Sequence, residues 1–225
     1  CINLTSRKDK LDHAIKVFTE LNIPSQFFIT KKHKLGGKFG CFHSKYIVVK
    51  DAYESGANTF LMFEDDVIDS EEYSLEKIKE CVNFMKKNKD WEIFFLGRGL
   101  PLSFNSIIIF LNKEEIVPNI FVGIFRENHA LAFNRNGMRK FIKYYENNVQ
   151  NIQENITYSD KIIEELFLDK SYYHKDNLFI QNDKVFTTDN EYNYGFIDTE
   201  TSNKITDNAR NIVSRYNVVK LNDFI

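Results

Sequence analysis

Apolar and polar positions alternate with two different periods along the first thirty residues. From Lys8 to Leu21 the apolar side chains recur every three or four residues, which predicts an amphipathic helix with one buried face. The expected buried positions of this helix are Leu11, Ile15, Phe18 and Leu21. Short apolar runs at Cys1–Leu4 and Ser25–Thr30 flank the helix and are typical of strands. This order predicts a β-α-β unit with parallel strands and a right-handed crossover.

The same alternation continues to the end of the WEIFFLG stretch and then weakens. In order, it predicts a helix over Ser44–Ser55, a strand over Asn58–Phe63, a helix over Glu71–Asn88 and a strand over Trp91–Leu96. Beyond these we expect short strands and turns over Arg98–Phe133, helices over Arg135–Asn147 and Asp160–Leu168, and a weakly periodic tail from Thr188. With 225 residues, of which 43% are hydrophobic, the chain is expected to form one α/β domain with a mainly parallel central sheet flanked by helices.

Charge and cysteine content exclude several classes of protein. A net charge of −2 lacks the basic excess of a protein that binds nucleic acid non-specifically. No apolar run approaches the roughly 18 residues of a membrane-spanning helix. The three cysteines have no metal-ligand spacing and favour a reducing, cytoplasmic compartment, although Asn3 and Asn155 begin N-glycosylation triplets. Because the chain opens inside an expected strand, we expect residues before Cys1 to be missing from it.

The stretch FLMFEDDVI, Phe60–Ile68, leads an apolar strand directly into the carboxylates Glu64, Asp65 and Asp66. Two like charges about 4 Å apart repel by roughly 1 kcal/mol in water and roughly 4 kcal/mol at an effective dielectric constant of about 20, so a cation is expected beside them. Ligands of open α/β sheets gather at the carboxyl ends of strands, where Asn3–Arg7 are also expected to lie. Carboxylates in such a place suit Mg²⁺ or Mn²⁺. The alternative is that Asp65 or Asp66 caps a following helix while the other acids are solvated.

Further segments accompany the acidic triplet, in the order CINLTSRKDK, FGCFHSKYIVVKDAYESG, FLMFEDDV, DWEIFFLG and ENHALAFNRNGMRKF. In this order they resemble glycosyltransferase family 25, the lipooligosaccharide and procollagen β-galactosyltransferase group. That family has an I-N-L strand followed by basic residues, a G-C-x-x-S-H helix start, an apolar strand into E-D-D, a W-D-I-hydrophobic-L-G strand and an H-A-Y segment entering a helix. The resemblance covers Ile2–Tyr145 well and the remainder loosely. Lys45 stands where the family usually has His, and Leu131 where it usually has Tyr; KF precedes Gly40 in place of Gly-Glu.

The resemblance implies a GT-A-type nucleotide-sugar-binding fold and a specific reaction. A hexose, galactose or glucose, would move from a UDP-sugar to a hydroxyl of a glycan or glycosylated protein, with inversion, as in lipopolysaccharide biosynthesis. Residues 1–97 would bind the nucleotide, and residues 98–225 would form the acceptor half. A Mn²⁺ or Mg²⁺ ion on Asp66, together with Glu64, would neutralise the diphosphate leaving group. Asp65 would face the ribose or the donor sugar, while Asn3 and Arg7 would hold the nucleotide.

Ser44 and Lys45 open the second expected helix, and their position suggests a further donor contact. A helix amino terminus favours an anionic group, and Lys45 would add a positive charge beside a phosphate. The alternative for Lys45 is a solvated lysine at a helix start. A run of lysines precedes it and would attract an anionic donor or acceptor, although such a run is more often a solvated loop; it consists of Lys31, Lys32, Lys34 and Lys38.

An inverting transfer also needs a base for the acceptor hydroxyl, and a carboxylate is the usual choice. The candidate is Asp160 in ITYSDKIIEELF, because the family has an acid that opens a late helix; the alternative is an aspartate stabilised by the helix dipole. Glu164 and Glu165 are expected on the surface. His129, which begins HALAF, is expected near the donor from its match to H-A-Y, although a lone histidine is more often structural.

Several aromatic and imidazole groups late in the chain are weaker candidates. His174 in SYYHKDN is a possible third metal ligand, and four tyrosines would either line an acceptor groove by stacking or form an ordinary rim; these are Tyr172, Tyr173, Tyr192 and Tyr194.

Two other functions stay open. One is a non-catalytic relative of glycosyltransferases that binds or scaffolds, and the less favoured one is a sugar-nucleotide nucleotidyltransferase, which would need a glycine-rich loop after the first strand. For the transferase, the expected partners are a UDP-sugar donor and a glycan or glycoprotein acceptor, with no nucleic acid and no transmembrane segment. We expect it in the cytoplasm or at the periphery of a membrane.

Overall fold

The computed structural model describes residues 1–99, 107, 109–110, 113–154 and 159–182. Up to Gly97 the elements are β1 (Ile2–Leu4), α1 (Lys8–Glu20), β2 (Phe28–Thr30), α2 (Gly37–Glu54), β3 (Thr59–Phe63), β4 (Val67–Asp69), α3 (Leu75–Lys87) and β5 (Ile93–Gly97). They are followed by β6 (Glu115–Val117), β7 (Ile120–Val122), β8 (Ala130–Asn134), α5 (Arg135–Glu154), α6 (Ser159–Leu166), β9 (Ser171–His174) and β10 (Phe179–Gln181). The tail from Thr188, with Tyr192 and Tyr194, lies outside the described residues.

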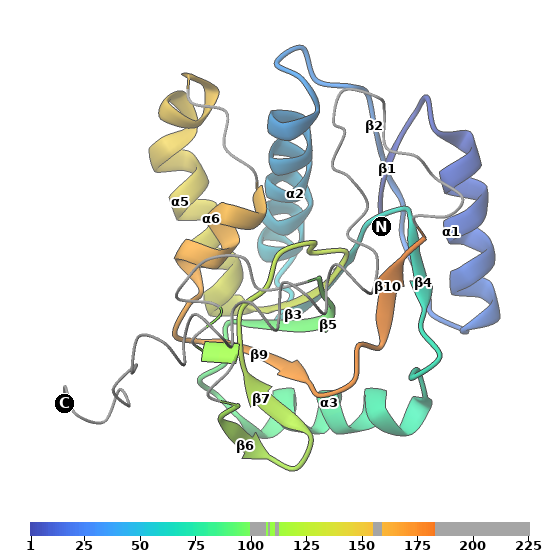
Figure 1. The fold of residues 1–225 in the computed structure, drawn as a ribbon. Helices are drawn as coiled ribbons and strands as arrows, with labels where there is room; N and C mark the ends of the chain where they lie inside the picture. The colour runs from blue at the N-terminus through green and yellow to red at the C-terminus, as the bar shows by residue number, and fades with distance from the viewer. Residues whose placement is uncertain (100–106, 108, 111–112, 155–158, 183–225) are drawn as a thin grey trace, which may run out of the picture.

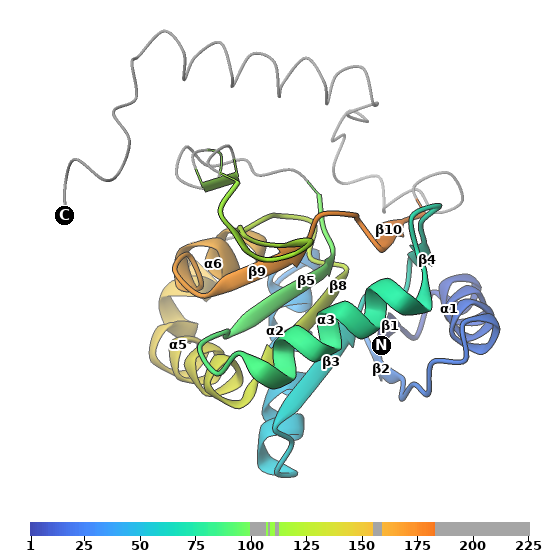
Figure 2. The ribbon, with the colours of Figure 1, turned by 90° about the horizontal axis from the view of Figure 1, so that it is seen from below.

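The central sheet forms a middle layer with α2, α5 and α6 on one face and α3 on the other (Figures 1 and 2). Its central strands are apolar on both faces, as the WEIFFL run requires. On β5, Ile93 and Phe95 pack into the core under α2, α5 and α6. Phe94 and Leu96 point the other way, into a second core shared with α1 and α3. The expected α/β class, with helices flanking a sheet, is therefore confirmed.

The sheet is largely antiparallel, so the expectation of a mainly parallel sheet is wrong. Within the described residues its eight strands run in the order β3-β8-β5-β9-β7-β6, with β10 beside β4 and β5. β8 lies antiparallel between β3 and β5, so these two strands do not pair with each other. In the described part of this sheet, β5–β9 and β10–β5 are the only parallel pairs. Strand spacing along the sequence does not reveal such an insertion, because β8 comes from much later in the chain.

The predicted β-α-β unit is present, but it forms a sheet of its own. β1 and β2 pair in parallel, with Ile2 opposite Phe28 and Leu4 opposite Thr30. A bridge between Ile2 and Glu64 joins this small sheet to the end of β3. The junction brings the carboxyl end of β1 next to the acidic triplet.

Helix α1 buries a different face from the one its apolar spacing predicts. Its buried positions are Lys10, Ala14, Val17 and Phe18, whereas Ile15 is 43% exposed. A lysine thus occupies the first position of the buried stripe. This rotation matters for the site, because the stripe points the Lys10 side chain toward the acidic triplet.

Helix α2 begins at Gly37, well before the expected start at Ser44. Gly36 precedes it with a φ of 90°, a left-handed conformation that glycine adopts without strain. Phe39 and Phe42 then lie on the buried face of the helix. The glycines of KLGGKFG suggested a loop, but these buried aromatic residues continue the helix through them.

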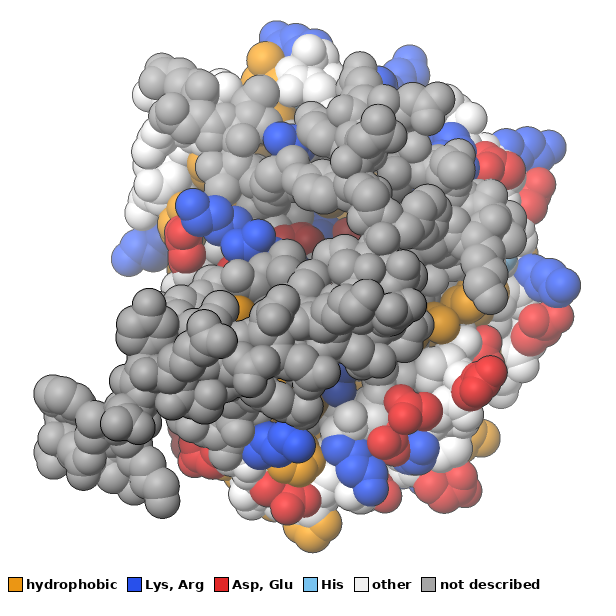
Figure 3. Space-filling view, viewed as in Figure 1, with side chains coloured by type: hydrophobic (Ala, Val, Ile, Leu, Met, Phe, Trp, Pro, Cys, Tyr) orange, Lys and Arg blue, Asp and Glu red, His pale blue; other side chains and the backbone are white. Residues whose placement is uncertain are grey.

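The described surface carries charges of both signs. In Figure 3, Lys and Arg side chains are interspersed with Asp and Glu over the coloured part of the face shown. This mixture agrees with the net charge of −2. Among the described helices, none has the length and apolar character needed to cross a bilayer.

Candidate functional site

A pocket of about 370 Å³ lies where the carboxyl ends of β1 and β3 meet. Its walls come from the end of β1, the first turn of α1, the end of β2 and the first half of α2. The acidic triplet, Glu64–Asp66, lines it together with Asn3 and Arg7. Asn3 Nδ2 donates a hydrogen bond of 2.7 Å to Asp65 Oδ2. The two strand ends that the sequence singles out are therefore neighbours, as predicted.

The cation expected beside the triplet is partly supplied by Lys10. Its Nζ lies 3.0 Å from Asp66 Oδ2 and 3.5 Å from Asp65 Oδ1. Burial lowers the pKa of Lys10, but the charges of Asp66 and Asp65 outweigh this effect and raise the pKa above the ordinary lysine value. Sequence reasoning missed Lys10, which resembles any lysine in the first turn of a helix. The only available signal was its spacing from Ala14 on the buried stripe.

Lys45 supplies a second cation to the acidic cluster. Its side chain is 1% exposed, and its Nζ lies 2.9 Å from Glu64 Oε1 and 3.6 Å from Asp160 Oδ1. The ammonium group also donates to Ser159 Oγ at 3.2 Å. Burial opposes its charge, but the surrounding acidic groups raise the pKa of Lys45 well above its usual value. A solvated lysine is excluded by this burial.

Ser44 and Lys45 lie inside α2 and not at its amino terminus. The predicted anion site at a helix start is therefore wrong at these two residues. Both still line the pocket. Ser44 is 6% exposed and contributes to the wall of α2.

The four carboxylates of the cluster carry more negative charge than its two lysines can neutralise. When all are ionised, Glu64, Asp65, Asp66 and Asp160 carry two more charges than the lysines that contact them. Burial raises the pKa of Glu64, Lys45 opposes the shift, and Asp66 and Asp160 add to it. Burial also raises the pKa of Asp65, against the charge of the neighbouring lysine. The excess negative charge equals that of one divalent cation.

Asp160 lies in the first turn of α6, as predicted. Its Oδ2 accepts a hydrogen bond from the backbone N–H of Glu127 at 2.9 Å. Its Oδ1 accepts from Asn128 Nδ2 at 3.2 Å and from Ser159 Oγ at 3.1 Å. Among the described residues it is not one of those that line the pocket, and Lys45 connects it to them. Asn128, 1% exposed, was not anticipated from the sequence.

His129 lies beneath the triplet and is 2% exposed. Its Nε2 donates to the backbone oxygen of Phe179 at 2.9 Å, which fixes the tautomer, and its own backbone oxygen accepts from Glu64 N. Gly97 makes room for the ring, since a Cβ there would lie 2.6 Å from Nε2. Burial lowers the pKa of His129. The ring supports the floor of the site and does not line the pocket formed by the described residues.

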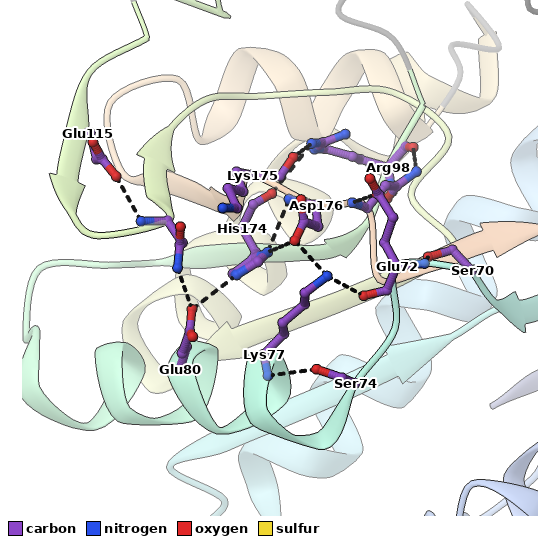
Figure 4. Close-up of polar contacts among 12 residues, drawn as sticks. Ser70, Glu72, Ser74, Lys77, Glu80, Arg98, Glu115, His174, Lys175 and Asp176 are labelled. Atoms are coloured by element: carbon purple, nitrogen blue, oxygen red, sulfur yellow. Dashed lines mark hydrogen bonds and ion pairs between the residues drawn. The ribbon is translucent and has the colours of Figure 1, made fainter.

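His174 belongs to a different polar network, on the α3 side of the sheet (Figure 4). The backbone N–H of Asp176 donates to His174 Nδ1, so Nε2 carries the hydrogen and donates to Glu80 Oε2 at 3.2 Å. Lys77 Nζ contacts Asp176 at 2.8 Å in the same network. This contact set gives His174 a structural role away from the acidic triplet.

Three other late residues also differ from expectation. Tyr172 and Tyr173 are 9% and 4% exposed and pack into the two cores, so they cannot line an open groove. Glu164 is 3% exposed and pairs with Arg126 Nε at 3.1 Å, whereas Glu165 is exposed as predicted.

The alternative that Asp65 or Asp66 caps a following helix is wrong, because strand β4 follows them.

The residues at the triplet fit a hard divalent cation in part. In the described chain, no group of three or more His, Cys, Asp or Glu side chains is arranged to hold a metal ion. However, Asp66 Oδ1 and Asn3 Oδ1 are buried and accept no hydrogen bond from the described residues. Mg²⁺ and similar ions are commonly held by one or two carboxylates, with water and substrate phosphates completing the coordination. Carboxylate and amide oxygens of this kind suit such a site.

Basic residues also line the pocket. Lys31, Lys32 and Lys38 line it, whereas Lys34 does not belong to the lining. The pocket thus combines acidic and basic residues in one lining. Such a combination can bind a cation and an anion side by side.

Comparisons with known proteins leave the family of the chain unassigned. No protein-family model matches it, and no curated protein matches it. Among solved structures it is similar to the crystal structure of A197 from STIV, with 12% sequence identity and a TM-score of 0.38. That match covers 80% of this chain and 92% of the other. At this level the likeness carries no argument about function.

Proposed function

We propose that the protein is a metal-dependent, inverting glycosyltransferase of the GT-A type. Its donor would be a UDP-hexose and its acceptor a hydroxyl of a glycan or glycosylated protein. The observation that carries this proposal is the shared pocket of Asn3, Arg7 and the triplet, in which Asp66 retains a buried oxygen without a hydrogen-bond donor. Acidic and basic residues that line one pocket suit a cation next to a diphosphate.

Each wall of the pocket has a role in this proposal. Asp66, together with Glu64, would hold Mn²⁺ or Mg²⁺, which offsets the charge that develops on a diphosphate leaving group. Asn3 orients Asp65 through their 2.7 Å hydrogen bond, so that Asp65 can accept from hydroxyls of the ribose or the sugar. The positive charges of Arg7 and of the pocket lysines Lys31, Lys32 and Lys38 would attract the phosphates of the donor.

Asp160 remains the proposed base for the acceptor hydroxyl. Its side chain is 25% exposed, and it is held by Lys45, Asn128 and the backbone of Glu127. These donors orient the carboxylate, as a base that must reach the proton of the acceptor hydroxyl requires.

A thermal-shift panel tests donor binding. We expect UDP-galactose or UDP-glucose to raise the melting temperature when Mn²⁺ is present and to have little effect without it. A ligand at about 100 times its dissociation constant stabilises by roughly 2.7 kcal/mol, which such an assay detects. GDP serves as the control nucleotide. If no nucleotide shifts the melting temperature with or without Mn²⁺, the proposed function is wrong.

Cys41 provides a footprint of the same pocket. Cys41 is an exposed residue that lines the pocket, and desolvation of its thiol by the neighbouring groups raises its pKa to about 11. Since the thiolate is the reactive form, alkylation by iodoacetamide at pH 8 should be roughly 100-fold slower than at an unperturbed thiol and should accelerate about tenfold per pH unit. UDP with Mn²⁺ should slow it further, as measured by mass spectrometry.

Cys1, which does not line the pocket, provides the internal control for the footprint. Protection of both cysteines would indicate a general change in the protein, and protection of neither would place the nucleotide elsewhere.

A non-catalytic relative is the second candidate, favoured by one observation. Two lysines already neutralise part of the acidic cluster. Metal-dependent donor binding without sugar transfer or donor hydrolysis would identify this alternative.

A further inference from the structure

Lys10 contacts Asp66, the carboxylate on which the proposed metal site depends. Its ammonium group lies 3.0 Å from Asp66 Oδ2 and 3.5 Å from Asp65 Oδ1. A divalent cation that binds Asp66 meets a positive charge that is already there. Lys10 and the ion therefore cannot both hold the same oxygens at full strength.

The two lysines of the cluster differ in how firmly they are fixed. Lys45 projects from the middle of α2 and connects Glu64, which follows β3, to Ser159 and Asp160 in the first turn of α6. Lys10 projects from the first turn of α1, and its ammonium group contacts Asp65 and Asp66 of the triplet. Its side chain also lines the pocket. A lysine carries its ammonium group on a flexible four-carbon stem, so this group can turn along the pocket while the helix backbone stays in place.

The protein alone offers few ligands to a metal ion. Asp66 Oδ1 and Asn3 Oδ1 are the buried pocket oxygens that accept no hydrogen bond within the described chain. Ions such as Mg²⁺ usually complete their coordination with water and substrate phosphates. A nucleotide diphosphate would supply the missing oxygens and also a new partner for a displaced ammonium group.

We propose that Lys10 competes with the divalent ion for Asp66, so that the ion binds tightly only together with a nucleotide diphosphate, to which Lys10 turns. This inference rests on the proposed function and concerns the coupling between its two ligands. Coupling of this kind is reciprocal, so the metal must strengthen nucleotide binding by the same factor.

The test compares Mn²⁺ binding, measured by electron paramagnetic resonance and calorimetry, in the wild type and in Lys10→Met. We expect the wild type to bind Mn²⁺ at least tenfold more tightly when UDP is present. Without UDP, Lys10→Met should bind Mn²⁺ at least tenfold more tightly than the wild type. In the variant, the strengthening by UDP should fall severalfold, because no ammonium group is left to move to the phosphates.

Lys16→Met is the matched control, because Lys16 lies on the same helix, is 73% exposed and contacts Glu20 at 3.9 Å, away from the triplet. It should leave all affinities unchanged. Lys10→Gln serves as a second variant if Lys10→Met is not folded by circular dichroism.

The possible outcomes separate the inference from the proposed function. Equal Mn²⁺ affinity in the wild type and both Lys10 variants would overturn the competition, even if UDP-sugars bind. A wild type whose Mn²⁺ affinity is unaffected by UDP would overturn the coupling. If UDP-sugars fail to bind but Lys10→Met still gains Mn²⁺ affinity, competition stands and the proposed donor is wrong. Absence of Mn²⁺ binding in every variant, with or without UDP, would overturn both this inference and the proposed metal-dependent function.

Discussion

Replacing Asp66 with alanine is expected to abolish metal-dependent donor binding, by at least 100-fold in affinity, while the domain remains folded. Asp66 is the pocket carboxylate with a buried oxygen that accepts no hydrogen bond from the described residues. Its other oxygen contacts Lys10, which keeps Asp65 as a partner after the substitution. The backbone oxygen of Asp66 still accepts from Asn182 N, so the strand that follows is preserved.

The measurement is a titration of UDP-galactose and UDP-glucose in the presence of Mn²⁺, with circular dichroism to verify folding. Asp69→Ala is the matched control, because Asp69 lies on the adjoining strand β4, is exposed and does not line the pocket. Unchanged donor affinity in Asp66→Ala would remove the central claim about this site. A loss of affinity in both variants would point to an effect on the fold.

The second large effect is expected on stability, from Lys45→Met. The substitution retains the length of the side chain but leaves Glu64 and Asp160 without their shared counter-charge. Breaking a buried ion pair on one side typically costs about 3–5 kcal/mol. Since both carboxylates are 25% exposed, water offsets part of this loss, and we expect a value near about 3 kcal/mol. Urea denaturation measures it.

Two comparisons make the Lys45 result specific. Lys50→Met, on the same helix, removes an exposed ion pair with Glu146 and should change stability little. Adding Glu64→Gln to Lys45→Met should recover part of the lost stability, because the remaining buried charge is reduced. If Lys45→Met is as stable as the wild type, the two carboxylates do not depend on this lysine.

The local elements of this protein could be predicted from its sequence because each carries its own periodicity. WEIFFL and FLMF are apolar runs bounded by turn residues, and they form strands β5 and β3. The order of strands in the sheet could not be predicted in the same way. Pairing of β8 with both β3 and β5 depends on contacts between distant segments, and nothing in the FLMF or WEIFFL runs specifies that neighbour.

Site residues that directly follow a strand could be predicted from the sequence. Site residues whose position depends on packing between distant segments could not. The rule that ligands gather at the carboxyl ends of strands predicted that Asn3 lies near the triplet, and the two are hydrogen-bonded. Lys10 and Asn128 were missed, because their roles arise from burial against residues far away in the chain. Ser44 was misplaced because the glycines before it suggested a loop, whereas the buried Phe39 and Phe42 extend the helix.

The insertion of β8 between β3 and β5 also has a consequence for synthesis on the ribosome. The β1–α1–β2 unit closes early, because its strands pair over a short separation. β3 and β5 must instead wait, with their facing edges unpaired, until Ala130–Asn134 has emerged. An unpaired apolar strand edge invites association with other chains. The nascent chain should therefore be most dependent on chaperones between the emergence of β5 and that of β8.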